Sequence, residues 1–274
     1  MLSLHPMWPL PPSGWALAAS DVHVWLASLD QAAAYVEQLA ETLTADERTR
    51  VARFYFERDR HDFIVARGLL RTILAHYLNT APRDIRFHLG HDGKPSLQPA
   101  PQPPGIRFNL SHSGRLVLYA IARQWEVGVD IEYMSPLRDL ESITAHVFSR
   151  REQAVLHALP EEVKRQAFYA CWTRKEAYIK ANGDGLARGL DQFDVSLAPG
   201  EAAQLVNVEW DPGEASRWSL QDLPLIPGYA AALAIEGKEW RLSCWEWPTG
   251  PEVRSAGRCQ VVGRVRGELG TLGR

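Results

Sequence analysis

The segment from Val127 to Tyr133 constrains the fold more than any other, because apolar and acidic side chains alternate along it. In an extended strand its aliphatic residues share one face, and Asp130 and Glu132 lie side by side on the other. Two adjacent carboxylates oppose each other's ionisation unless a cation is close. The pattern therefore predicts a strand buried on one face, with either a solvent-facing acidic edge or one side of a cation site on the other.

A third carboxylate, Glu176, lies on the apolar stripe of a helix predicted over Glu161–Asn182. The stripe is formed by Phe168, Trp172 and Ile179. Burying a carboxylate is costly unless it is paired or bound to a metal. A simple i,i+4 ion pair with Lys180 explains the lysine but not the inward-facing acid. Three carboxylates with lysines nearby indicate a hard divalent metal ion that holds a phosphorylated substrate.

Capping signals predict where the other helices begin and end. Thr44–Glu47 and Ser149–Glu152 both have capping-box spacing, which predicts a helix starting at each. Pro160 closes the second of these helices. A longer helix is predicted to end near Asn79, after a run of apolar residues at helical spacing.

The apolar strands suggest an internal duplication. Residues 21–26 alternate as a strand, and two antiparallel hairpins are expected, one joining 116–122 to 127–133 and one joining 228–235 to 240–247. We expect an α+β fold of two pseudo-symmetric halves with a ligand site in the cleft between them. The expected divisions are a flexible N-terminal segment (1–20), an N-terminal half (21–126), a C-terminal half (127–247) and a disordered tail (248–274).

Composition narrows the functional classes. The 274 residues carry a formal net charge of -3, with a pI near 6.3, so no global basic field favours a nucleic acid. Three cysteines, in no metal-ligand spacing, favour a reducing cytosolic compartment. The chain begins with no secretory signal pattern, and no run approaches the ~18 apolar residues of a membrane span. We therefore expect a soluble, cytoplasmic protein that binds neither nucleic acid nor membrane.

The segment Phe108–Ser113 gathers polar side chains between a Pro- and Gly-rich loop and a strand. Its serines either cap a turn or, together with backbone N–H groups and His112, form a phosphate cradle. Lys94 lies on a Gly-Lys-Pro turn and either is a solvated lysine or adds a cation to that cradle. The residues alone leave both interpretations open.

Five motifs, in this order and spacing, resemble those of the 4'-phosphopantetheinyl transferases of the surfactin-synthetase-activating type. They are Gly93-Lys94-Pro95, Phe108–Ser113, Gly128–Glu132, Phe148 with Glu152, and Trp172–Lys180 followed by Asn182–Gly185. The resemblance covers roughly residues 20 to 247, and the N-terminal part looks most like cyanobacterial members. It implies a monomer of holo-(acyl-carrier-protein) synthase type. Such an enzyme transfers the 4'-phosphopantetheine group of coenzyme A to a serine of an apo carrier protein and releases adenosine 3',5'-bisphosphate.

The resemblance also implies a magnesium site. Asp130, Glu132 and Glu176 would be the ligands of Mg²⁺, for which Mn²⁺ is an expected substitute. The catalytic residues would be Asp130, Glu176 and Lys180. Lys180 would neutralise charge that develops on the phosphorus and the leaving group, and Glu176 is the candidate base for the proton of the attacking serine.

Coenzyme A is placed by the same resemblance. Ser111 and His112 would meet its phosphates, and Lys94 its nucleotide end. Lys175 and Lys180 would lie along the diphosphate. The 3'-phosphate would face Arg50 and Arg53.

Two positions depart from the family pattern. Glu47 and Asp62 stand where basic residues are usual. This departure predicts weaker binding of the 3'-phosphate unless another cationic side chain substitutes. The candidates are Arg60, His61 and Arg67.

The carrier protein would dock along Tyr133–Phe148 and in the region after Gly185. Acyl and peptidyl carriers both remain open as partners. Two other functions are considered. A non-catalytic homologue that binds coenzyme A or a carrier protein predicts the loss of an acid or of Lys180, and both are present. A metal-dependent phosphohydrolase leaves the Ser-His-Ser segment unexplained.

Overall fold

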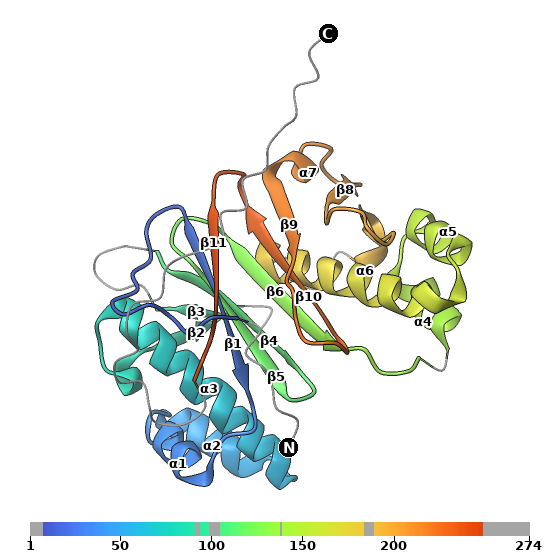
Figure 1. Ribbon diagram of the computed structural model, residues 1–274. Coiled ribbons are helices and arrows are strands. Elements are labelled where there is room, and N and C mark those ends of the chain that lie inside the picture. The colour runs from blue at the N-terminus through green and yellow to red at the C-terminus, as the bar shows by residue number, and fades with distance from the viewer. Residues whose placement is uncertain (1–7, 91–93, 99–104, 138, 184–188, 249–274) are drawn as a thin grey trace.

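The computed structural model describes residues 8–90, 94–98, 105–137, 139–183 and 189–248 (Figure 1). The first half of the chain contains β1 (Asp21–Ser28), α1 (Ala33–Glu41), α2 (Ala45–Arg53), α3 (Glu57–Leu78), η1 (Pro82–Asp84), β2 (Phe87–Leu89), β3 (Pro95–Leu97), β4 (Arg107–Ser113) and β5 (Leu116–Ala122). The second half contains β6 (Val127–Tyr133), α4 (Leu140–Val147), α5 (Arg150–Ala158), α6 (Glu161–Asn182), η3 (Leu190–Gln192), β7 (Phe193–Val195), β8 (Leu205–Val208), α7 (Glu214–Arg217), β9 (Trp218–Asp222), β10 (Tyr229–Glu236) and β11 (Arg241–Glu246). The fold is α+β, as expected.

Two sheets form the centre of the molecule, with the long helices α3 and α6 on their outer sides (Figure 1). The first sheet has the strand order β11-β1-β5-β4, and the second has the order β6-β10-β9. The strands β2 and β3 pair with each other, as do β7 and β8. The edge strand β4 of the first sheet thus lies next to the edge strand β6 of the second (Figure 1).

Side-chain alternation builds the core in layers. One face of β1 and β5 packs against α3. The opposite face of both strands packs against one face of β6 and β10, so that the two sheets bury their apolar surfaces together. The other face of β10 packs against α6. The aliphatic residues of β6 therefore share one face, as predicted, and this face packs against the first sheet. Asp130 and Glu132 lie on the side of α6.

The two halves repeat one topology. In the first, β1 pairs antiparallel with β5 and β5 with β4; in the second, β6 pairs antiparallel with β10 and β10 with β9. Both expected hairpins are nevertheless wrong, since β5 and β6 lie in different sheets, as do β10 and β11. Each short connection carries the chain from one sheet to the other. As a result β11 pairs in parallel with β1. The division at residues 126 and 127 stays a proposal.

The helix boundaries agree closely with the capping signals. Thr44 and Ser149 both form complete capping boxes at the starts of α2 and α5. Asn79 ends α3 in the left-handed conformation, with φ of 49°, and Gly183 ends α6 with φ of 79°. The local signals were sufficient here because each satisfies backbone groups within its own turn.

The segment 8–20 packs against the body of the protein, so the expectation of a flexible segment over 1–20 needs correction from Trp8 onward. Trp8 is buried and donates its indole N–H to the carbonyl of Pro224, and Trp15 stacks on His76. Large aromatic surfaces account for this packing. The expected disordered tail lies outside the described residues from 249 onward. Within the described part of the chain, no helix is both long and apolar enough to cross a bilayer.

Candidate active site

The helix α6 lies directly against the backbone of β6 at Gly128. A Cβ atom added to Gly128 would lie 2.1 Å from the carbonyl oxygen of Ala177 and 2.4 Å from the backbone nitrogen of Ala181. Only glycine allows this approach. The close contact brings Glu176 and Lys180 of the helix over the acidic face of the strand.

Asp130 is the most buried acid of the group, with 1 % of its surface exposed. Its Oδ1 accepts a hydrogen bond of 2.7 Å from the Ser111 hydroxyl and another from the ammonium of Lys180. Lys180 also donates to the Ser111 oxygen at 3.1 Å. The second oxygen, Oδ2, is buried and has no hydrogen-bond partner among the described residues.

Glu132 and Glu176 share the electrostatic environment of Asp130. Glu132 accepts a hydrogen bond of 2.8 Å from the Ser113 hydroxyl. Burial raises the pKa of all three carboxyl groups. The pKa of Glu176 is lowered in turn by Lys180 and raised further by Asp130 and Glu132. The three carboxyl groups therefore lie close enough to interact electrostatically, and their role as a shared metal site stays a prediction.

These oxygen ligands fit a divalent cation whose coordination shell is completed by a substrate. No three His, Cys, Asp or Glu side chains in the described ranges are arranged as a metal site by themselves. Mg²⁺ commonly binds one or two protein carboxylates and takes its other ligands from water and substrate phosphates. The unpartnered Oδ2 of Asp130 is a buried anionic oxygen of the kind that such a cation stabilises.

Lys175 does not join this cluster. Its side chain is 1 % exposed, and its ammonium lies 2.8 Å from the Glu152 carboxylate and donates to the carbonyl oxygens of Leu190 and Phe193. Both Glu152 oxygens also accept backbone N–H groups. These contacts use all three N–H donors of the Lys175 ammonium, and none of them involves Asp130, Glu132 or Glu176. We therefore remove Lys175 from the expected diphosphate-binding residues, because helical periodicity turns it to a different side of α6 from Lys180.

Two of the predicted phosphate-binding residues of the first half, His112 and Lys94, interact with residues of α6. His112 is on β4, and partial desolvation lowers its pKa, an effect that Asp62 opposes and Lys180 reinforces. Lys94 donates to the carbonyl oxygen of Ala181 at 3.2 Å, at the end of α6. Gly93, its partner in the sequence motif, lies outside the described residues.

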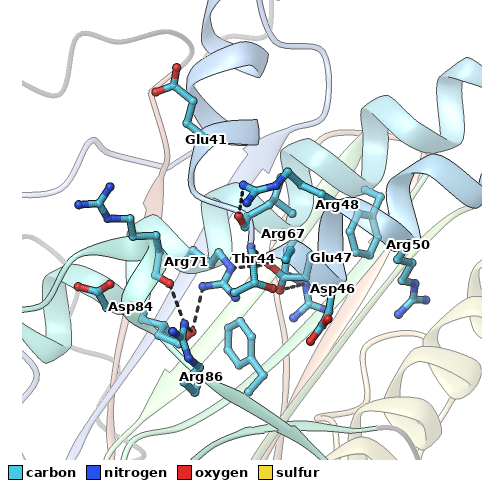
Figure 2. A pocket seen from close by; sticks show the side chains of 16 residues that line it. Glu41, Thr44, Asp46, Glu47, Arg48, Arg50, Arg67, Arg71, Asp84 and Arg86 are labelled. Carbon is cyan, nitrogen blue, oxygen red and sulfur yellow. Dashed lines mark hydrogen bonds and ion pairs between the residues drawn. The ribbon is translucent and has the colours of Figure 1, made fainter.

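A pocket of about 780 Å³ opens beside α2 and α3 and is rich in arginine (Figure 2). Arg50, one of the residues expected at the 3'-phosphate, lines it and lies over the Phe63 ring. Arg67 lines the same pocket, and its guanidinium carbon lies 5.7 Å from the centre of the Phe63 ring. Arg53 is exposed at the last residue of α2 and is not among the lining residues.

The Glu47 carboxylate contacts several other residues that line this pocket (Figure 2). Its Oε2 accepts the backbone N–H of Thr44 at 3.0 Å and the Arg71 Nε–H at 2.8 Å. Its Oε1 lies 3.6 Å from Arg67. Arg71 is fully buried and was not predicted from the sequence. The signal that could have indicated it is the acid at position 47, since a buried arginine needs a carboxylate partner.

Asp62 is also engaged by cations. Both of its oxygens accept from Arg115 at 3.0 Å, and Arg58 lies 3.8 Å away. Arg115 pairs at the same time with Asp30. Glu47 and Asp62, the two departures from the expected basic pattern, are thus paired with arginines of the first half. These arginines offset the repulsion that either acid would exert on a phosphate.

Two family models match the chain in succession. Residues 25–124 match the N-terminal model of the 4'-phosphopantetheinyl transferases, and residues 126–234 match the model of the 4'-phosphopantetheinyl transferase superfamily. The 4'-phosphopantetheinyl transferase HetI of Nostoc is 39 % identical over 89 % of this chain and 99 % of its own length. The 4'-phosphopantetheinyl transferase Sfp of Bacillus subtilis is 32 % identical over 72 % of this chain and 84 % of its own.

Among solved structures, the chain is similar to the holo-(acyl-carrier-protein) synthase of Thermotoga maritima, with a TM-score of 0.34 and 19 % identity. The match covers 41 % of this chain and 63 % of that one.

Proposed function

The chain belongs to the 4'-phosphopantetheinyl transferase family, and we propose from this premise that Asp130, Glu132 and Glu176 hold Mg²⁺ against the diphosphate of coenzyme A. The enzyme transfers phosphopantetheine to carrier proteins, as its named relatives do. The observation that carries the proposal is the buried, unpartnered Oδ2 of Asp130 beside two further acids and a lysine. Mn²⁺ is the expected substitute metal.

In this proposal the bound cation supplies charge neutralisation and polarisation of the phosphoryl oxygens. Lys180 reaches the same place from α6 and stabilises the negative charge that moves onto the departing adenosine 3',5'-bisphosphate. Its ammonium donates to Asp130 and Ser111, and these contacts orient it. This preorganisation reduces the rearrangement needed when the diphosphate binds.

Glu176 is the proposed acceptor of the serine proton. Burial and the neighbouring acids raise its pKa, which makes it a better base than an exposed glutamate. The attacking serine belongs to the carrier protein. Its hydroxyl oxygen forms the new bond to the β-phosphorus as the bond from phosphorus to the departing adenosine 3',5'-bisphosphate breaks.

The remaining assignments concern recognition. We propose that His112 contacts the phosphates of coenzyme A and that Lys94 contacts its nucleotide end. Arg50 and Arg53 are proposed to face the 3'-phosphate. The carrier protein is proposed to dock on Tyr133–Phe148, where Tyr133 is half exposed. The part of the proposed docking region at residues 184–188 lies outside the described residues. A monomer acting in the cytoplasm completes the proposal.

Mass spectrometry of an apo carrier protein incubated with the enzyme, coenzyme A and Mg²⁺ tests the proposal. We expect the phosphopantetheine mass to be gained, to be lost with a chelator, and to be restored by Mg²⁺ or Mn²⁺. Asp130→Asn and Glu176→Gln should reduce transfer at least 100-fold while the far-UV circular dichroism is unchanged. Transfer at the wild-type rate by either variant contradicts the metal assignment.

A further inference from the structure

The edge strands of the two sheets, β4 and β6, are joined by side chains instead of a backbone ladder. Three residues of β4 at two-residue spacing reach the neighbouring strand. Asn109 Oδ1 accepts the N–H of Val129 at 2.9 Å, Ser111 donates to Asp130, and Ser113 donates to Glu132. The spacing matches the pleat, so one face of β4 reaches the backbone of Val129 and the carboxylates of Asp130 and Glu132.

Each serine has its hydrogen-bonding capacity engaged within the protein. The Ser111 hydroxyl gives its single proton to Asp130 and accepts from Lys180. The Ser113 hydroxyl gives its proton to Glu132 and accepts the N–H of Tyr133 at 3.0 Å. A hydroxyl has one proton to donate. In this arrangement neither serine can donate to a phosphate, although the family resemblance implies such a contact for Ser111.

The bonds also decide which carboxylate oxygens stay available. Ser111 and Lys180 both engage Oδ1 of Asp130, which leaves Oδ2 without a partner. Ser113 engages Oε2 of Glu132. Both serines come from the first half of the chain, whereas both acids belong to the second. The orientation of the acids is therefore set across the boundary between the sheets.

We propose that Ser111 and Ser113 are positioning residues that fix the carboxylates of Asp130 and Glu132 for a divalent cation. This inference rests on the metal site of the proposed function. Hydrogen-bond partners of metal ligands orient them, and removing such a partner typically weakens metal affinity by about 10- to 100-fold. Asn109 keeps the two strands in register by holding the backbone of β6.

The test measures Mn²⁺ binding by electron paramagnetic resonance, with saturating coenzyme A and without carrier protein, so that no turnover occurs. Ser111→Ala and Ser113→Ala should each raise the Kd for Mn²⁺ about tenfold or more. Ser113→Thr retains a hydroxyl on the more accessible serine and should stay within about threefold of the wild type. Ser219→Ala removes a strand hydroxyl that donates to the carbonyl of Gly237, far from the acids in the sheet order, and should leave the Kd unchanged.

Asp130→Asn separates the two levels of the proposal. If it binds Mn²⁺ as tightly as the wild type, the metal site itself is wrong. If it loses Mn²⁺ while both serine-to-alanine variants keep the wild-type Kd within twofold, only the positioning role is overturned. Thermal unfolding is followed for every variant, and if Ser111→Ala does not fold, the comparison of Ser113→Ala with Ser113→Thr decides the outcome.

Discussion

Gly128 of β6 and Ala177 of α6 are in backbone contact, at the point where the two elements that carry the acids cross. The missing side chain at Gly128 sets the distance between the strand acids and Glu176. Replacing this glycine tests how much of the activity depends on that spacing.

Gly128→Ala is expected to lower the transfer rate by about 100-fold, because the added methyl group must push α6 away and a displacement of about 1 Å can cost that much. The measurement is kcat for a carrier protein, with thermal unfolding recorded alongside. Gly105→Ala is the matched control, since its Cβ would have 3.9 Å to the nearest atom. Equal rates for the two variants would show that the helix position does not control catalysis.

The faces of the elements could be predicted from the sequence, but their partners could not. Alternation along β6 correctly placed its acids opposite its aliphatic residues, because that depends only on the pleat. The seven residues of β5 are buried on both faces, a pattern that fits any central strand and names no neighbour. The expected hairpin from β5 to β6 failed for this reason.

The site shows the same limit in its lysines. Glu176 and Lys180 are one helical turn apart, so their shared face was predictable, and Lys175 is about 100° away from Glu176 around the helix. Helical geometry alone could therefore have excluded Lys175 from the acidic face. The hydroxyl partners of the acids were not predictable, since nothing in the sequence places β4 beside β6.

Lys175→Met is expected to destabilise the protein by about 3–5 kcal/mol, because it leaves Glu152 charged and buried without its partner. Urea denaturation measures the loss. The double variant Glu152→Gln with Lys175→Met should recover part of it, since no uncompensated charge remains.

The same variants distinguish a structural role from coenzyme binding. At a temperature where Lys175→Met is folded, its KM for coenzyme A should stay within about threefold of the wild type. An increase in KM of more than tenfold, with unchanged stability, would return Lys175 to the coenzyme site.

Arg50→Ala is expected to raise the KM for coenzyme A by about tenfold, since a charge-assisted hydrogen bond contributes roughly 1.5–3 kcal/mol and this guanidinium is exposed. The KM for 3'-dephospho-coenzyme A should not change. Steady-state kinetics with both substrates gives the comparison, and Arg151→Ala serves as an exposed arginine on α5 for control. If the wild type uses both substrates equally well, no 3'-phosphate site exists.

Glu47→Gln probes the opposite charge in the same pocket. The change keeps the capping geometry but weakens the bonds to Arg71 and Arg67, so we expect lower stability together with a lower KM for coenzyme A. The freed positive charge accounts for the second effect. Urea denaturation and the KM are measured on the same preparation; a higher KM would mean that Glu47 helps to position the arginines for the nucleotide.

Stability should fall as the pH drops from 6.5 toward 4, and His23 accounts for a separable part of the loss. Burial lowers the pKa of this side chain from 6.5 to about 4, and Asp21 opposes the shift only in part. The Tyr77 hydroxyl lies 2.7 Å from the His23 Nδ1 and accepts the Trp25 indole N–H. Above pH 6.5 both the folded and unfolded states hold a neutral imidazole, so the pH has no effect through this group.

Between pH 6.5 and 4 the unfolded state binds a proton that the folded state does not, and the free energy of unfolding therefore decreases with a slope of up to about 1.4 kcal/mol per pH unit. Urea denaturation at half-unit pH steps measures this slope. His23→Gln should make it shallower over that window, while His157→Gln, which changes an exposed histidine of α5, should not. Parallel stability curves for the wild type and His23→Gln would mean that His23 takes up its proton in the folded state as readily as in the unfolded one.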